Sequence, residues 1–234
     1  MTRITLDAHP SVVIAPCEAL GKLLMAVYDG TYPQVSYRFS ANNIGGNPSP
    51  KDGSPRNVLL REIEEEYDSN HKEKTQFGET VLWAPSDDIE LIRNQLLQNA
   101  IPYGDFYVKA TQFPTDPTTK NYSAIFSAFY AKVGKEVIEA AESNLRRCRR
   151  LSPEGLTGIF TLDELANDFV KGELSTAHAT APILNHYFDS RIPFPKQLKA
   201  EHIGQVRDSF SDYSTEFQYS LKIATAIGLV ETEY

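Results

Sequence analysis

Cysteine is nearly absent from this chain, since Cys17 and Cys148 are the only two in 234 residues. Two thiols without metal-ligand spacing exclude both a disulfide framework and a zinc site. No apolar run reaches the ~18 residues of a membrane-spanning helix. The short polar stretch at 1–10 also lacks the apolar core of a secretion signal. These absences predict a cytoplasmic protein.

Positive charge is also scarce. The chain carries 23 lysines and arginines against 31 aspartates and glutamates, which gives a net charge of −8. A general nucleic-acid binder needs a basic surface, so this class is not expected. A phosphorylated small molecule is compatible, because a bound divalent cation reverses the local field. The composition is otherwise that of a globular domain, with 41% hydrophobic and 23% charged residues.

The first part of the chain is predicted to form strands. Residues 11–15 and 22–28 are rich in branched and apolar side chains, and residues 34–40 alternate apolar with polar side chains. Residues 42–56 are dense in glycine, proline, asparagine and serine, which is typical of a loop. A helix is expected at 57–67, with Val58, Leu59, Ile63 and Tyr67 on its buried face.

The rest of the chain is predicted to mix strands and helices. Strands are expected at 78–83, 103–113, 122–133 and 156–160, and helices from 86, at 136–150, from 161 and from 175 toward 188. The prolines near 190–195 suggest a boundary between a domain at 1–190 and an extension at 191–234. We expect this extension to be helical over 196–227 and to pack on the domain or on a partner, for example in a homodimer. The order predicts an α/β/α sandwich with a mixed sheet and additional C-terminal helices.

The most informative stretch lies in the helix at 57–67 and contains an arginine and four glutamates. On a helix, Glu62, Glu65 and Glu66 share one face. Three like charges repel one another unless a cation lies between them, and clustered carboxylates suit Mg²⁺ or Mn²⁺. A glycine-rich loop ends just upstream at Gly45 and Gly46, so loop and helix together predict a metal and phosphate site.

These residues resemble the Nudix family, whose motif runs from a glycine through an acidic residue to Arg-Glu-aliphatic-x-Glu-Glu. Gly46 is followed after five residues by Asp52, a shorter acid than the usual glutamate. Eight intervening residues follow Asp52, one more than usual, and then come Arg61, Glu62, Ile63, Glu64, Glu65 and Glu66. Asp68 and Ser69 stand where the family has glycine and an aliphatic residue.

The resemblance implies a Nudix-like fold and hydrolysis of a nucleoside diphosphate linked to another moiety. Glu65 and Glu66 would then bind Mg²⁺ or Mn²⁺, with help from Glu62 and the carbonyl of Gly46. Arg61 would hold one of the glutamates in place. The metal would neutralise pyrophosphate oxygens while an oriented water attacks phosphorus. The substrate and the general base are not specified by the motif.

Other interpretations stay open. Because the motif is degenerate, the chain is alternatively a catalytically inactive Nudix-fold module that binds a nucleotide and regulates another process. The glutamates could also be the solvated face of a helix-rich association domain. Asp52 is more often a turn residue than a ligand. The histidines at 71, 178 and 186 are interpreted as surface or packing residues rather than catalytic ones. The aromatic residues at 83, 103, 107 and 122 are interpreted as core, with base stacking as the alternative.

Overall fold

The computed structural model describes residues 8–28, 30–68, 72–74, 80–82, 86–148, 156–171 and 176–206. Its strands are β1 (Ser11–Cys17), β2 (Lys22–Val27), β3 (Ala41–Asn42), β4 (Ile44–Gly46), β5 (Lys72–Lys74), β6 (Thr80–Leu82), β7 (Ile101–Ala110), β8 (Tyr122–Tyr130), β9 (Leu156–Phe160) and β10 (Leu198–Gly204). Its helices are a 3₁₀ turn (Val35–Tyr37), α1 (Pro55–Glu66), α2 (Ser86–Asn99), α3 (Lys135–Cys148), α4 (Leu162–Lys171) and α5 (Thr180–Phe188).

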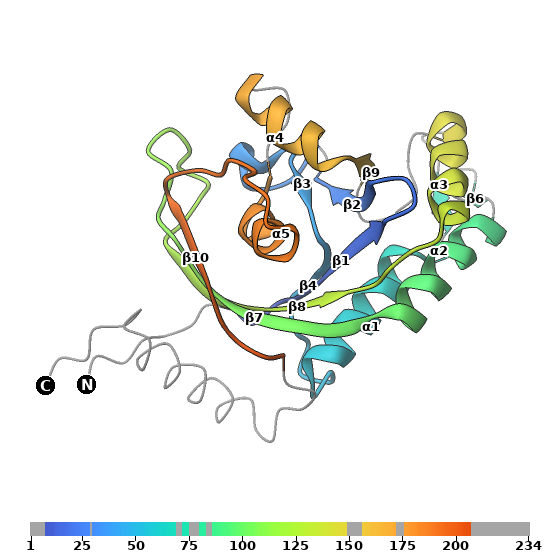
Figure 1. Cartoon of the computed structure of the whole chain (residues 1–234), viewed down its shortest axis with the longest axis horizontal. Helices are drawn as coiled ribbons and strands as arrows, with labels where there is room; N and C mark the ends of the chain where they lie inside the picture. The colour runs from blue at the N-terminus through green and yellow to red at the C-terminus, as the bar shows by residue number, and fades with distance from the viewer. Residues whose placement is uncertain are drawn as a thin grey trace, which may run out of the picture.

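One mixed sheet forms the centre of the molecule (Figure 1). Its main strand order is β10-β7-β8-β1-β2-β3, with β4 paired to β1 and β9 paired to β2. The β1–β8 pair is parallel, whereas the other pairs of this sheet are antiparallel. β5 and β6 form a separate two-stranded ribbon.

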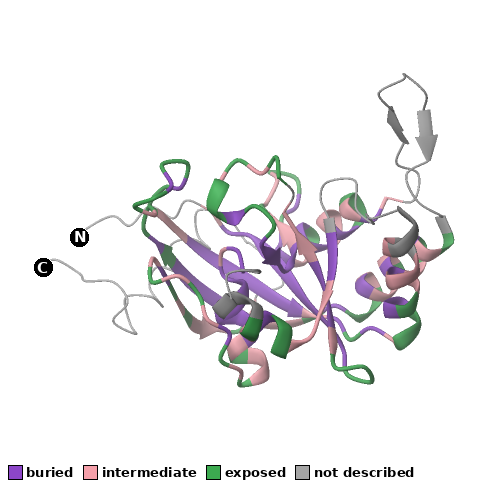
Figure 2. Cartoon of the chain, turned by 90° about the horizontal axis from the view of Figure 1, so that it is seen from above, coloured by how far each residue is buried: buried purple, intermediate pink, exposed green. Residues whose placement is uncertain are grey.

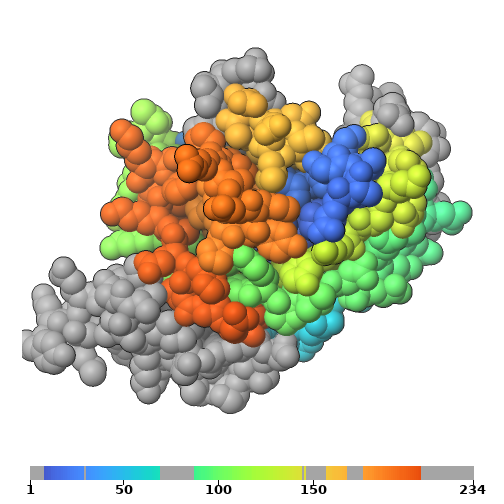
Figure 3. Space-filling view, viewed as in Figure 1, coloured from blue at the N-terminus to red at the C-terminus, as the bar shows by residue number. Residues whose placement is uncertain are grey.

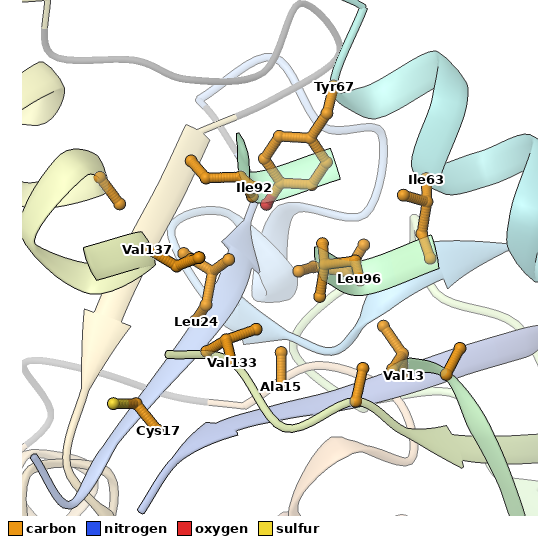
Figure 4. Close-up of a cluster of buried hydrophobic side chains, with 14 of the residues drawn as sticks. Val13, Ala15, Cys17, Leu24, Ile63, Tyr67, Ile92, Leu96, Val133 and Val137 are labelled. Carbon is orange, nitrogen blue, oxygen red and sulfur yellow. The ribbon is translucent and has the colours of Figure 1, made fainter. Parts of the chain in front are cut away.

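β1 lies in the middle of this sheet and contributes to a core on each face. Its side chains alternate, so Val13 and Ala15 join one buried cluster while Val12 and Ile14 join the other. The first cluster includes side chains of α1, α2 and α3, some of which are drawn in Figure 4. The buried residues follow the strands through the centre of the molecule (Figure 2).

Helices cover both faces of the sheet. α1, α2 and α3 lie on one side, and α4 and α5 lie on the other, where they adjoin the N-terminal strands (Figures 1 and 3). The predicted α/β class and mixed-sheet sandwich are therefore confirmed. A helix-rich association domain without a sheet beneath residues 57–67 is excluded, because Leu59 and Ile63 of α1 pack in one cluster with Val13 of β1.

α1 forms because its ends and its buried face are both well specified. The hydroxyl of Ser54 accepts a hydrogen bond from the amide of Asn57, and Pro55 follows at the first helical position. Val58, Leu59 and Ile63 are fully buried, as the sequence predicts. Burial of each such side chain contributes roughly 2 kcal/mol. The acidic side of α1 is left to face the glycine loop and solvent.

The strand predicted at 34–40 is wrong. These residues form turns and the 3₁₀ turn at Val35–Tyr37, and only Tyr37 of the three alternating apolar residues is buried. Val35 and Phe39 are 50% and 61% exposed. The local pattern misleads because the amides of Val35 and Ser36 donate to side chains of a distant loop instead of to a neighbouring strand.

The helix predicted at 196–227 is also wrong over 198–204, where β10 forms. β10 pairs with the edge of β7, from Leu198 opposite Ala110 onward. Leu198, Ala200 and His202 face inward more than Lys199 and Glu201, which is a strand period. Residues 207–234 lie outside the described part. The helix expected from 175 begins only at Thr180.

The predicted strand at 78–83 is described only as β6, and His71 and Trp83 lie outside the described residues. In the part of the chain that is described, no helix has the length and apolarity needed to cross a membrane.

Candidate functional site

The glycine loop places its backbone directly on β1. β4 pairs with the start of β1, with Gly45 opposite Val12 and Gly46 opposite Ser11. Gly45 has a φ of 137°, and a Cβ atom there would lie 2.2 Å from the carbonyl oxygen of Ser11. Any other residue would clash with this strand. The position therefore requires glycine.

Gly46 makes room for a carboxylate from α1. A Cβ atom on Gly46 would lie 2.6 Å from the carboxyl carbon of Glu62, so the Glu62 side chain rests against the Gly46 backbone. This side chain is 12% exposed. Two predicted site residues that are separated in sequence are thus in contact, which joins the glycine loop to the acidic helix.

Arg61 is the cation among the acidic groups of α1. Its Nη2 lies 2.8 Å from Glu62 Oε1, and its Nη1 lies 2.8 Å from Glu65 Oε2. Nη2 also donates to the carbonyl of Asn47 at 2.7 Å, and Nε donates to Asp52 at 3.0 Å. The hydrogen bond to Asp52 raises the pKa of Arg61 further. Arg61 therefore offsets the like-charge repulsion on this face.

Asp52 anchors the loop between β4 and α1. Its carboxylate is 6% exposed and accepts a hydrogen bond from the amide of Ser49 at 2.6 Å, in addition to those from Arg61. Burial alone would raise the pKa of Asp52, but the hydrogen bonds from Arg61 and the Ser49 amide lower it. Asp52 thus acts here as a turn and anchoring residue.

The remaining two glutamates lie in different surroundings. The Glu65 side chain is 45% exposed at its ion pair with Arg61. Glu66 is half-buried, and its charge adds to the burial that raises the pKa of Tyr28 and of Tyr67. Across the described ranges, no three or more histidine, cysteine, aspartate or glutamate side chains are grouped so that they could hold a metal ion.

The donors present suit a divalent cation in kind. Carboxylate oxygens of Glu62, Glu65 and Glu66 and the carbonyl of Gly46 are hard ligands of the type that Mg²⁺ prefers. The space beside Gly46 that a Cβ atom would fill holds the Glu62 carboxylate. Arg61, however, already neutralises Glu62 and Glu65. A metal ion at these oxygens would compete with its guanidinium group.

A cavity of about 340 Å³ opens beside the glycine loop. Gly45, Gly46 and Asn47 line one side of it, and β1, β7 and β8 contribute apolar residues. Two long loops, at 30–40 and 111–121, complete the lining. Its aromatic residues are Tyr28, Tyr32, Tyr37, Phe113, Tyr122, Phe126 and His178. Among the described residues that line it, Lys120 is the one lysine or arginine, and none is an aspartate or glutamate.

The rings of this cavity pack against one another. Tyr28 and Tyr32 are stacked with ring centroids 3.7 Å apart. The ring centroids of His178 and Tyr37 lie 4.6 Å apart, and Nε2 of His178 is 3.1 Å from the hydroxyl of Tyr32. Such rings offer flat faces on which a planar heterocycle can stack.

His178 occupies an unusual conformation at the cavity wall. Its φ is 45°, a value that residues other than glycine adopt infrequently. Desolvation by burial lowers its pKa from 6.5 to about 4, so the ring is neutral at neutral pH. A neutral imidazole can join an aromatic wall without bringing a positive charge into it.

The sequence interpretation found only part of this site. It named several aromatic residues that could stack a base instead of packing in the core. Of these, Tyr122 lines the cavity, whereas Tyr107 is buried and Tyr103 contacts His186. It missed Tyr28, Tyr32 and Tyr37, and it interpreted His178 as a surface or packing residue. The one available signal was the recurrence of tyrosine within 28–37, beside a proline that disfavours a strand.

Comparisons with solved structures return proteins of the family that the motif resembles. A MutT/Nudix family protein from Listeria innocua is 18% identical, with 80% of this chain and 94% of that chain covered and a TM-score of 0.42. The MutT protein from Methanosarcina mazei is 16% identical, with 79% and 96% covered and a TM-score of 0.42.

A third solved structure is a bifunctional NMN adenylyltransferase/ADP ribose pyrophosphatase from Francisella tularensis. It is 9% identical, with 81% of this chain and 42% of that chain covered and a TM-score of 0.40. No protein-family model matches the sequence, and no curated protein matches it either.

Proposed function

We propose that this protein binds a nucleoside diphosphate linked to another moiety and hydrolyses its pyrophosphate bond with a divalent cation. The observation that carries the proposal is the junction of cavity and acidic helix at one dipeptide. Gly45 and Gly46 line the aromatic cavity, and Gly46 lies against the carboxylate of Glu62. A ligand whose base occupies the cavity would extend its phosphates past the glycines toward α1.

The cavity suits the nucleoside end of such a ligand. The rings that line the cavity favour a planar base by stacking, and the neutral His178 avoids a buried charge beside it. Lys120, on the loop at 111–121, would attract a phosphate or ribose-phosphate group. The lining residues that the structure describes include no carboxylate that would repel an anion.

The acidic end would hold the cation. Glu62, Glu65 and Glu66, with the carbonyl of Gly46, are the ligands we assign to Mg²⁺ or Mn²⁺. When bound, the ion would neutralise charge on the pyrophosphate oxygens. Arg61 would orient Glu62 and Glu65 through its two ion pairs, and Asp52 would hold Arg61 in position. We further infer that the protein acts in the cytoplasm.

The test is turnover of a panel that includes ADP-ribose and UDP-glucose, with and without Mg²⁺. The double variant Glu65→Gln, Glu66→Gln is expected to lose at least about 100-fold in kcat/KM, because it removes two anionic ligands at nearly constant shape. Glu64→Gln is the matched control, since Glu64 is exposed on α1 and has no proposed role. Full activity in the double variant would remove the assignment.

The second candidate function is nucleotide binding without turnover. Arg61 supports it, because this side chain already occupies Glu62 and Glu65 by direct ion pairs. Asp68 and Ser69 in place of the usual glycine and aliphatic residue support it as well. Calorimetry with the same compounds separates the two candidates. Binding that needs no metal and releases no product would favour the regulatory module over the enzyme.

A further inference from the structure

The two loops that line the cavity are joined to each other across its edge. The loop at 30–40 connects β2 to β3, and the loop at 111–121 connects β7 to β8. The amide of Ser36 donates to Asp116 Oδ2 at 2.7 Å, and the amide of Val35 donates to Thr118 Oγ1 at 3.0 Å. Loops that are distant in sequence are thereby held side by side.

Asp116 is the centre of this connection. It is 4% exposed, and its Oδ1 accepts hydrogen bonds from both the amide and the hydroxyl of Thr118. These bonds and the one from Ser36 hold the pKa of Asp116 well below its usual range. The carboxylate is therefore ionised at neutral pH, and hydrogen bonds to an ionised acceptor are stronger than neutral ones.

The connection sets the position of the aromatic wall. Tyr37 follows Ser36 directly, and its ring meets that of Phe113 on the other loop at 5.6 Å and 70°. Tyr37 also packs on His178. The loop at 30–40 contributes Tyr32, Gln34 and Tyr37 to the cavity, and the loop at 111–121 contributes Phe113, Thr119 and Lys120.

We propose that Asp116 is a positioning residue for ligand binding, because its carboxylate ties the loop at 30–40 to the loop at 111–121 and so holds Tyr37 and Phe113 as one wall of the cavity. This inference rests on the proposed nucleotide-binding function. Asp116 is neither one of the residues assigned to the cation nor one that lines the cavity. Its effect is to spare the ligand the entropic cost of ordering two loops.

The fold itself does not depend on Asp116. β7 and β8 pair continuously from Ile101 opposite Tyr130 to Ala110 opposite Tyr122, with one irregularity, and this ladder holds the hairpin in place. The base of the other loop is closed by backbone hydrogen bonds between Tyr28 and both Phe39 and Ser40. A variant at Asp116 should therefore fold while its loops separate.

The experiment compares Asp116→Ala with wild type in two independent measurements. Hydrogen exchange of the Val35 and Ser36 amides reports on the loops without any ligand. Binding and turnover of ADP-ribose and UDP-glucose report on function. We expect faster exchange at both amides, a KM or Kd about 10-fold higher, and kcat within about twofold of wild type.

Three further variants sharpen the test. Asp116→Asn keeps one acceptor oxygen and should restore part of the affinity, a rescue that a packing role would not require. Thr118→Ala removes the bond to Val35 but keeps the Asp116 bond to Ser36, so its effect should be smaller and of the same sign. Thr115→Ala, at an exposed neighbouring position, should leave both measurements unchanged.

Unchanged exchange in Asp116→Ala would overturn the connection between the loops. Faster exchange with unchanged affinity would show that the connection is structural only and would overturn the positioning role. A lower kcat with an unchanged KM would also overturn the positioning role. If wild type binds neither compound, the proposed function fails and the positioning role falls with it, whereas the exchange data still decide whether Asp116 joins the loops.

Discussion

The acidic helix and the aromatic cavity share Gly45 and Gly46 but are built in different ways. The charged groups of the first, including Arg61, Glu62 and Glu65, come from a short segment and its adjoining loop. The rings of the second come from segments that are far apart in the chain. The first is held by ion pairs to one guanidinium group, and the second by ring packing and loop-to-loop hydrogen bonds. A substitution in one region should therefore leave the other region unchanged, unless it replaces Gly45 or Gly46.

Gly45→Ala should have the largest effect, since it disturbs both regions. The substitution requires a strained φ and a clash with the Ser11 carbonyl oxygen, and we expect a loss of about 3 kcal/mol or more in the free energy of unfolding. Gly53→Ala is the matched control, because Gly53 also has a positive φ but has open space around it. It should cost only about 1 kcal/mol. Thermal and denaturant unfolding measure both, and equal losses would contradict the close approach.

Arg61→Ala should affect the acidic helix alone. It leaves the buried carboxylate of Asp52 without its charged partner, and we expect a loss of about 2 kcal/mol at neutral pH. The folded pKa of Asp52 is lowered, so the stability it contributes is present above its ordinary value of 3.8 and is lost as the pH falls through the folded pKa. The difference between variant and wild type should shrink in acid.

Arg56→Ala is the control for this change, because Arg56 lies on the same helix and, within the described part of the chain, makes one hydrogen bond, to the carbonyl of Ala100 at 3.3 Å. Its cost should be below about 1 kcal/mol. Denaturant unfolding as a function of pH measures both variants. An Arg61→Ala loss no larger than that of Arg56→Ala would show that the network around Asp52 contributes little.

His178→Phe should affect the cavity alone, and chiefly through pH. The pKa of His178 is lowered from 6.5 to about 4, so its contribution to stability is complete above pH 6.5 and falls as the pH drops toward 4. Between pH 6.5 and about pH 5 this amounts to roughly 2 kcal/mol. His9, buried beside Ser127 and with its pKa also lowered to about 4, acts in the same direction.

We therefore expect the His178→Phe variant to lose less free energy of unfolding than wild type on acidification. His9 should account for part of the loss that persists in this variant. Arg61→Ala leaves both histidines in place and should keep the part of the dependence that they contribute. Unfolding free energies at pH 7 and about pH 5 provide the readout. An undiminished dependence in His178→Phe would assign the effect to other groups.

Ser54→Ala should have the smallest effect. It removes the side-chain cap at the start of α1, at a cost of about 1 kcal/mol. Because the cap lies away from the cavity, the affinity for a ligand should change less than the stability. A Ser54→Thr variant keeps the hydroxyl and should retain most of the stability. If ligand affinity fell in step with stability, the two regions would be coupled more tightly than their separate construction implies.

Local sequence was sufficient where neighbours along the chain decide the structure. The buried face of α1 with Val58, Leu59 and Ile63 was predicted correctly, as were the strands near 11–15, 22–28 and 122–133. It was insufficient where distant partners decide. Residues 34–40 alternate like a strand, yet Asp116 and Thr118 bind their amides. Residues 198–204 were predicted to be helical, yet they pair with the edge strand β7 as β10.

The sequence by itself determined the acidic helix and its buried face, the glycine loop upstream of it and the order of elements that makes a mixed sheet, because spacing and local conformational preference act over a few residues. Only the tertiary structure decided that Glu62 would rest against Gly46, that β10 would form one edge of the sheet, and that rings from distant segments would enclose a cavity. Contacts of that kind depend on which surfaces the folded chain brings within a few ångströms of each other, and no local pattern encodes that distance.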